Sequence, residues 1–147
     1  MAPHHHNPRD GEYCAIIRLL QTGVLLAVLH GRPSPVPAGL VAALHAALHG
    51  FNTQDCAQIY DNTAPWMRGH ASRADTIAAC RQNFVVGRQN GVTLLRLTTD
   101  GVGHAMSTHA YRQPLLLRRA LFGRTITTRE TMQLVQVRAR WYVLALW

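Results

Sequence analysis

Apolar residues recur at steps of three and four between residues 40 and 51, which is the period of a helix with one buried face. Gly50 is typical of a residue that ends a helix, so we expect the first helix to stop there. The buried stripe consists of Leu40, Val41, Leu44, Ala47, Leu48 and Phe51. The pattern therefore predicts a helix that packs one side against a core.

Two further helices are predicted before residue 90. Asn52 or Thr53 is a suitable N-cap for the second helix, and Pro65 stops it, so that Trp66 and Met67 are expected to fill the core from a loop. The third helix starts at Ser72, with the spacing of a capping box. The inward faces of the two helices carry Cys56, Ile59, Tyr60, Thr63, Ile77, Cys80 and Phe84.

From residue 92 the pattern changes to that of strands. Residues 92–99 are β-branched and apolar, and Asp100-Gly101 after them is a strong hairpin signal. Further strands are predicted over residues 104–111, 125–137 and 141–147. The predicted fold class is α+β, with three N-terminal helices packed on a curved four-stranded antiparallel sheet.

The connection between the second and third predicted strands is unusually apolar. The segment Leu115–Phe122 carries five large apolar residues, which is more than an exposed hairpin loop usually holds. Either this segment packs under the sheet, or it forms an exposed apolar patch for a partner or a membrane surface.

The first 38 residues read as a leader. Residues 19–29 form an uncharged apolar stretch that is too short for a membrane span but suits the hydrophobic region of a secretory signal. A proline-rich stretch follows and ends in Val36-Pro37-Ala38, while the long polar start with Asp10 and Glu12 fits a signal less well. We expect residues 1–38 to be a disordered leader with a signal or anchor segment and a linker, residues 39–147 to be the domain, and the location to be secreted or extracytoplasmic. A membrane anchor and a cytoplasmic location stay open.

The amino-acid composition gives the chain a strong positive net charge. The chain has 15 Lys and Arg residues against 7 acidic ones, and every one of the 15 is arginine, which excludes chemistry that needs a lysine. The arginines are scattered along the sequence and accompany no nucleic-acid-binding motif, so no specific nucleic acid is expected. His45 and His49 have the spacing of a zinc helix but no acid between them, and we expect neither a metal site nor a cofactor.

Cys56 and Cys80 both fall on the predicted inward faces of consecutive helices. A bridge between them agrees with the export signal, and it would constrain the unfolded chain by roughly 3.5 kcal/mol on the chain-entropy model. Two buried thiols in a cytosolic protein are the alternative. We expect the disulfide.

The order of helices and strands, together with FNTQDCAQIYDNTAPWMRG and SRADTIAAC, resembles the nuclear transport factor 2-like superfamily, in particular exported bacterial members with one cysteine on each of helices two and three. The likeness runs from about Leu40 to Trp147. It implies a cone-shaped α+β barrel with a pocket at its open end, as in the ketosteroid isomerases and polyketide cyclases of that superfamily.

The resemblance also implies where a site would lie. Enzymes of the superfamily use a pocket carboxylate as base, and Glu130 shares the parity of Met132 and Leu134, so it is a candidate base whose pKa burial would raise. Tyr60 and His109 are the other catalytic candidates. The pocket is expected to be lined by Tyr60, Trp66, Met106, Glu130 and Trp141.

No acid pair or nucleophile–base pair stands out in the sequence. We therefore expect a non-catalytic exported domain that binds a small hydrophobic ligand or a partner protein. An isomerase, cyclase or dehydratase that uses a pocket carboxylate is one alternative, and an arginine-rich module for anionic polymers is another. A homodimer through the sheet and a weak membrane contact through Leu115–Phe122 are further partners left open.

Overall fold

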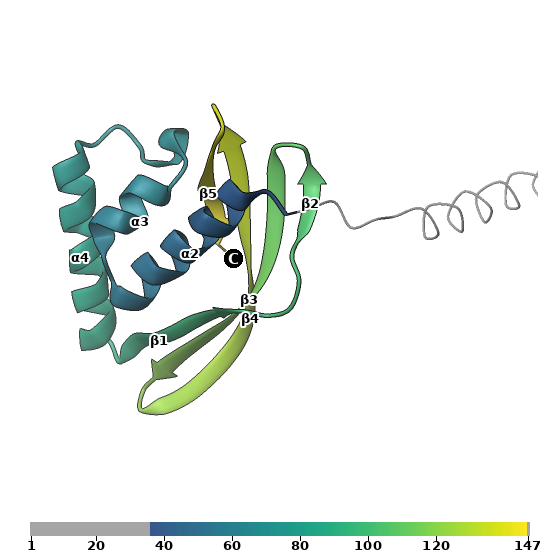
Figure 1. Ribbon diagram of the computed structural model, residues 1–147. Helices are drawn as coiled ribbons and strands as arrows, with labels where there is room; N and C mark the ends of the chain where they lie inside the picture. The colour runs from purple at the N-terminus through teal and green to yellow at the C-terminus, as the bar shows by residue number, and fades with distance from the viewer. Residues whose placement is uncertain (1–35, 147) are drawn as a thin grey trace, which may run out of the picture. The chain divides into compact units, whose positions relative to one another are not determined.

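The computed structural model describes residues 36–146, where helices come first and strands follow (Figure 1). The helices are α2 (Ala38–Thr53), α3 (Cys56–Asn62) and α4 (Arg73–Gln89), with a 3-10 helix, η1 (Pro65–Met67), between the last two. The strands are β1 (Val92–Thr99), β2 (His104–Ser107), β3 (Ala110–Leu121), β4 (Arg124–Val137) and β5 (Arg140–Leu146). The predicted α+β class, with helices packed on a curved antiparallel sheet, is confirmed. The signal segment and most of the predicted leader lie outside the described residues.

The boundary between α2 and α3 differs from the prediction. Gly50 lies inside α2 and is buried, and a Cβ there would come within 3.3 Å of Ile59. The glycine is needed because α3 crosses α2 at this point. The turn is made instead by Gln54, which has a left-handed φ of 55°, and by Asp55, whose side chain caps α3 by accepting from the N–H groups of Ala57 and Gln58.

The start of α4 is confirmed. Ser72 is its N-cap, and the Ser72 hydroxyl oxygen accepts a hydrogen bond of 3.1 Å from the Asp75 N–H. Cys80 on this helix is joined to Cys56 on α3 by a disulfide, with 5.9 Å between the two Cα atoms. The predicted disulfide is therefore present in the structure, and it fastens α4 to α3.

The sheet has the order β1-β3-β4-β5, and β2 pairs with β3 beyond the end of β1. It has five strands, where the sequence predicted four, because the segment Leu115–Phe122 is not a loop. Its first seven residues belong to β3, the long central strand, in which Leu115 is fully buried. Residues 104–111, predicted as one strand, are split between β2 and the start of β3 by a tight turn.

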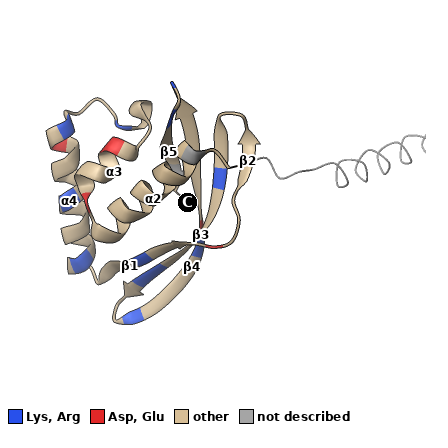
Figure 2. Ribbon diagram, viewed as in Figure 1, with Lys and Arg blue, Asp and Glu red and all other residues tan. Residues whose placement is uncertain are grey.

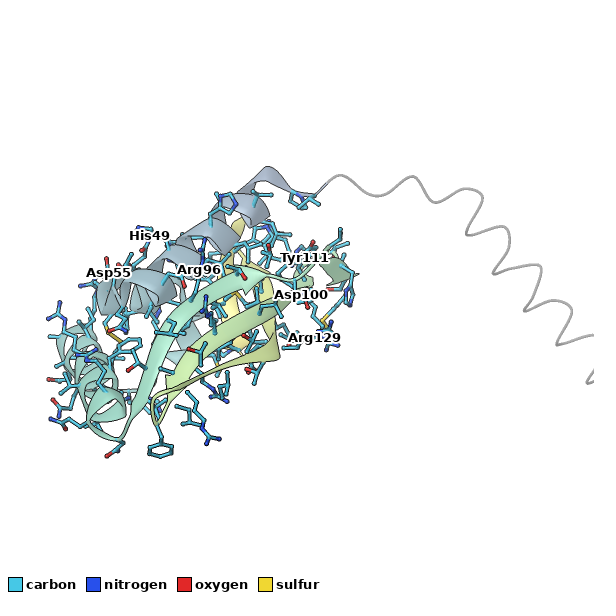
Figure 3. All side chains as sticks on the ribbon, turned by 90° about the horizontal axis from the view of Figure 1, so that it is seen from below. His49, Asp55, Arg96, Asp100, Tyr111 and Arg129 are labelled. Carbon is cyan, nitrogen blue, oxygen red and sulfur yellow. A yellow bond between two sulfur atoms is a disulfide. The ribbon has the colours of Figure 1, made fainter. Side chains whose placement is uncertain are left out.

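Pro114 is an unusual residue within β3, since proline is rare in central strands. In the structure Pro114 lies level with the gap between β1 and β2, and its carbonyl accepts a hydrogen bond of 2.9 Å from the Asp100 N–H. Because the N and the carbonyl of one strand residue face the same edge, the missing N–H of Pro114 faces this gap and removes no ladder hydrogen bond. Asp100 also forms an ion pair of 3.3 Å with Arg129 of β4, on the other side of β3 (Figure 3).

The core lies between α2 and the inner face of the sheet. Asn52, near the end of α2, brackets the backbone of Leu97 on β1: its amide donates to the Leu97 carbonyl at 2.8 Å, and its side-chain oxygen accepts from the Leu97 N–H at 2.6 Å. The buried residues of this core are Leu40, Ala47, Leu97, Tyr111, Leu115, Met132, Leu134, Trp141 and Val143. The face that the helices cover is therefore filled largely by side chains of α2.

Trp66 and Met67 do not fill the core, contrary to prediction. They are 58% and 52% exposed, and both belong to η1, which begins at Pro65. Ala64 is buried in their place, and its N–H donates to the carbonyl of Val143 on β5 at 2.8 Å. This contact joins the end of α3 to the last strand.

Candidate functional site

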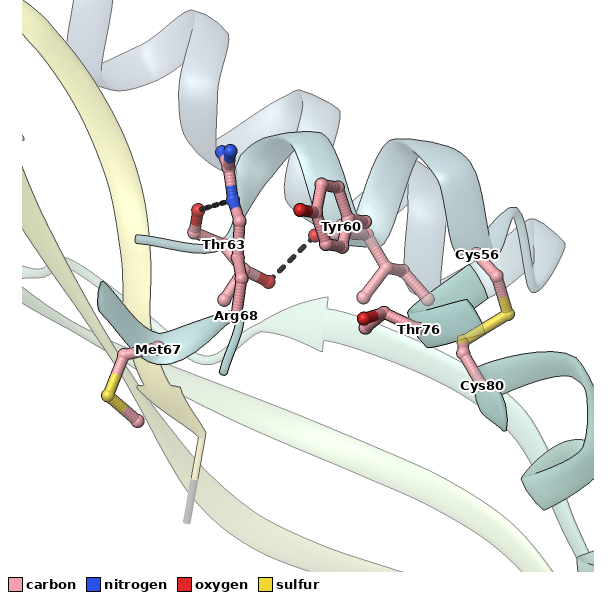
Figure 4. Close-up of a pocket in the computed structure, with 8 residues that line it drawn as sticks. Cys56, Tyr60, Thr63, Met67, Arg68, Thr76 and Cys80 are labelled. Carbon is pink, nitrogen blue, oxygen red and sulfur yellow. Dashed lines mark hydrogen bonds between the residues drawn. A yellow bond between two sulfur atoms is a disulfide. The ribbon is translucent and has the colours of Figure 1, made fainter. Parts of the chain in front are cut away.

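A pocket of about 190 Å³ lies between α3 and α4, beside η1 (Figure 4). Its lining is mostly apolar, and Tyr60, Thr63, Thr76 and Arg68 are the lining residues with polar groups. The lining residues are Cys56, Ile59, Tyr60, Thr63, Met67, Arg68, Thr76 and Cys80. The disulfide is therefore part of the wall of the pocket as well as a link between its two helices.

A second hollow adjoins the first on the other side of the disulfide. It has about 300 Å³ and shares Ile59 and Cys80 with the first pocket, while Phe51 and Phe84 make it more aromatic. The space between α3 and α4 thus extends past the sulfur bridge in both directions.

The local sequence explains how the pocket forms. Cys56, Ile59, Tyr60 and Thr63 follow one another at helical spacing and turn one side of α3 toward α4. The short helix then ends where the Thr63 hydroxyl donates to the Ile59 carbonyl at 2.8 Å. Arg68 folds back after η1, and its Nε donates to the Thr63 carbonyl at 3.0 Å. The guanidinium of Arg68 is thereby held beside the pocket.

An arginine–tyrosine cluster borders the pocket. The Cζ atom of Arg68 lies 4.8 Å from the centroid of the Tyr60 ring and 5.8 Å from that of Tyr142 on β5. Arg73 lies 5.7 Å from the Tyr60 ring, and Arg140 lies 5.0 Å from the Tyr142 ring. Cation–π contacts of this kind attract a guanidinium to a ring face and hold both in place.

Asp61 ties the cluster together. Its carboxylate accepts two hydrogen bonds from Arg73, at 3.2 and 2.8 Å, and its main-chain carbonyl accepts from Arg68 at 3.1 Å and from Arg140 at 3.2 Å. The hydrogen bond from Arg73, together with the positive charges of the three arginines, holds the pKa of Asp61 below its usual value. The same hydrogen bond and the negative charge of Asp61 raise the pKa of Arg73. Three positive charges face one negative charge, so this side of the pocket is electropositive.

The predicted pocket residues do not gather in one cavity. Tyr60 lines the pocket between α3 and α4, whereas Trp141 is buried in the main core and borders a different hollow, next to α2. Trp66 is exposed on η1, and Met106 is 48% exposed on β2. The resemblance to a cone-shaped barrel had implied that these residues line one pocket at its open end. In the structure Tyr60 faces α4 instead of the sheet.

Glu130 lies on the inner face of the sheet. It is paired with the buried Leu115 across β3 and β4, and paired residues of antiparallel strands point to the same face. Its carboxylate accepts a hydrogen bond of 2.6 Å from the hydroxyl of Thr128. The third catalytic candidate, His109, lies in the turn before β3, where its ring makes a 3.1 Å hydrogen bond with Gln136. Glu130, Tyr60 and His109 therefore belong to three separate parts of the domain.

His45 and His49 are both exposed on α2. The ring of His49 makes a hydrogen bond of 2.7 Å with the side chain of Gln58. Within residues 36–146 no group of three or more His, Cys, Asp or Glu side chains is placed to hold a metal ion. Over the same residues, none of the helices has the length and apolarity needed to cross a bilayer.

Sequence reasoning did not select Met67, Arg68 and Thr76 as pocket residues. Thr76 could have been found, since it precedes Cys80 by one helical turn and so shares its side of α4. Met67 and Arg68 reach the pocket through the fold of η1, for which the sequence has no periodic signal.

Comparison with known proteins supports the fold. No protein-family model matches the chain, and no curated protein matches it. Among solved structures, it is similar to a nuclear transport factor 2-like protein of unknown function from Shewanella oneidensis (TM-score 0.50, 14% identity, 74% of this chain and 93% of that chain). It is also similar to Aln2 from a Streptomyces species (TM-score 0.50, 13% identity, 78% and 90% covered).

A third similar structure is that of a SEC-C motif containing protein from Rhodopseudomonas palustris (TM-score 0.52, 19% identity, 85% and 86% covered). At these identities the likeness concerns the fold alone. Residues 36–146 have the nuclear transport factor 2-like α+β fold, with the helices packed on one face of a strongly curved sheet.

Proposed function

We propose that this is a non-catalytic ligand-binding domain of an exported protein, and that the pocket between α3 and α4 takes a small, mainly apolar ligand. The observation that carries the proposal is the combination of a mostly apolar lining with a few polar groups, which is the usual character of a small-molecule site. A buried cavity of about 150 Å³ accommodates benzene. A pocket of about 190 Å³ therefore suits a ligand with a single ring or a short chain.

Single-ring compounds are suitable probes, and toluene, phenol and benzoate differ in polarity at nearly constant size. We expect each to shift the amide resonances of α3 and α4 in titrations followed by NMR. Thr76→Phe should abolish these shifts because the larger side chain occupies the pocket. Ala78→Phe is the matched control, since Ala78 is exposed on the same helix. Shifts that persist in Thr76→Phe, or that map to another part of the domain, would contradict the proposal.

Export is supported by the disulfide, because disulfides persist mainly in oxidising compartments. The intact mass of the protein from its native host, measured with and without reduction, tests this part. We expect a mass without the leader and a gain of about 2 Da on reduction, since two thiol hydrogens return. A full-length chain with free thiols would contradict export.

Enzymatic catalysis through Glu130 is the second candidate function. It is favoured by the position of this carboxylate on the inner face of the sheet, next to the hydroxyl of Thr128. A general base must reach the proton that it removes, and a substrate would have to enter beside Leu115 to meet it. If any substrate is turned over, Glu130→Gln should abolish turnover without changing the binding of single-ring probes between α3 and α4.

A further inference from the structure

The outer face of the sheet gathers arginines from three strands. Arg96 on β1 is paired directly with Arg118 on β3, and Arg129 on β4 is paired with Leu116 on β3. The next pair along, Leu97 and Leu117, packs into the core. Because side chains alternate between the two faces of a sheet, Arg96 and Arg118 point away from the helices. Figure 2 shows basic residues, in blue, on these strands.

The positive charge of this face is poorly balanced. Arg129 pairs with Asp100 at 3.3 Å, but its side chain is 87% exposed. Within the described part of the chain, no carboxylate lies within 4.0 Å of Arg96 or Arg118. Like charges directly opposite each other destabilise a pair of strands. The arrangement is unfavourable for the isolated domain, and an anionic partner would relieve it.

An exposed aromatic residue stands at one end of the same strands. The turn between β3 and β4 consists of Phe122 and Gly123, with φ angles of 48° and 79°. Positive φ at both positions is the geometry for which Asn-Gly is preferred, and a bulky side chain is strained there. The ring of Phe122 borders Gly91 on one side but is 77% exposed. Packing alone does not account for a strained and exposed phenylalanine.

Aliphatic side chains accompany the arginines. Leu95 is 44% exposed at the irregularity of β1 next to Arg96, and Leu116 lies between Arg118 and Pro114 on β3. A soluble polyanion would use the guanidinium groups and gain little from aliphatic neighbours. A bilayer uses both, because apolar side chains enter the headgroup region while arginines meet anionic lipid phosphates. A second copy of the same face is a poor occupant, since it would bring arginines against arginines.

We propose that this surface, formed by Arg96, Arg118 and Arg129 with Leu95 and the turn residue Phe122, binds the surface of a bilayer that contains anionic phospholipid. The proposal is independent of the pocket between α3 and α4. The sequence analysis expected a membrane contact through Leu115–Phe122, but Leu115 is buried. In this proposal the contact is made by the arginines of the outer face and by Phe122 at the tip of the hairpin.

Vesicle flotation of the full chain tests the proposal. We expect binding to phosphatidylcholine vesicles with 30% phosphatidylglycerol, and much weaker binding to vesicles of phosphatidylcholine alone. Because each arginine near an anionic surface contributes about 1 kcal/mol, Arg96→Gln/Arg118→Gln should bind roughly 25-fold more weakly. Arg81→Gln/Arg138→Gln is the matched control, since both residues are exposed, lie elsewhere and remove the same charge. Any contribution of the leader is common to all variants.

Phe122→Asn separates binding from folding. Asparagine suits the first position of this turn, so the variant should have a higher thermal midpoint than the natural chain and yet bind the anionic vesicles several-fold more weakly. Equal vesicle binding by the natural chain, the double arginine variant and Phe122→Asn would overturn the proposal. So would binding to a double-stranded DNA fragment that needs Arg96 and Arg118 but not Phe122, because that result assigns the face to a soluble polyanion.

Discussion

The arginines that surround Asp61, near the end of α3, and the arginines on the outer face of the sheet have opposite roles. Arg68, Arg73 and Arg140 donate hydrogen bonds to Asp61 and lie over tyrosine rings, so their charges are used within the domain. Arg96 and Arg118 lie opposite each other with no such partners among the described residues. The same side chain therefore stabilises one region and is available for a partner in the other.

Breaking the disulfide should have the largest effect, and it should act on the α3–α4 region. In a Cys14→Ser background, Cys56→Ser/Cys80→Ser removes the constraint on a loop with a sequence separation of 24 residues, which costs roughly 3.5 kcal/mol of unfolding free energy. Urea unfolding measures the loss, and binding of single-ring probes between the helices should weaken with it. Vesicle binding at a temperature where the variant is folded should stay unchanged. A loss below about 1 kcal/mol would show that the disulfide contributes little to the free energy of unfolding.

Arg68→Ala should lower the unfolding free energy by about 2 kcal/mol, since it removes two hydrogen bonds to main-chain carbonyls and two cation–π contacts. Arg118→Ala is the matched change on the outer face, and it should alter stability by less than about 0.5 kcal/mol. Chemical denaturation of both variants measures the contrast. Equal effects would remove the distinction between the two sets of arginines.

Arg118→Glu should raise stability slightly, by about 0.2–1 kcal/mol, because it turns a like-charge pair with Arg96 into an opposite-charge pair. The same change should weaken binding to anionic vesicles roughly 25-fold, since it removes as much positive charge as the double glutamine variant. Thermal unfolding and flotation on one preparation give both results. A variant that is less stable than the natural chain would show that Arg118 makes a favourable contact within the fold.

The smallest effect concerns Asp61 and pH. Its pKa in the folded state lies below the usual value of about 3.9, so its ion pair with Arg73 stabilises the fold above that pH and is lost as the pH falls through the lowered pKa. Asp61→Asn should therefore unfold at a slightly lower temperature than the natural chain at pH 6, and this difference should shrink between pH 4 and pH 2. The effect is small because both side chains are about half exposed. A difference that does not change with pH would assign it to the loss of packing.

Local signals in the sequence were reliable where one element decides the outcome. Ser72 caps α4 as expected, because the capping hydrogen bond spans only three residues. The inward faces of α3 and α4 brought Cys56 and Cys80 together as predicted. Gly50 was misread as a helix end because it is required by a contact with Ile59, nine residues away on another helix.

The sequence by itself determined that helices come first and strands follow, that Cys56 and Cys80 share a side of their helices, and that Glu130 points inward, since each follows from the period of a single helix or strand. Only the tertiary structure decided that residues 115–121 form part of a central strand, that Tyr60 faces α4, and that Arg96, Arg118 and Arg129 share one surface. These outcomes depend on strand register and on the crossing of helices. Such contacts join residues that are distant along the chain, so no local pattern specifies them.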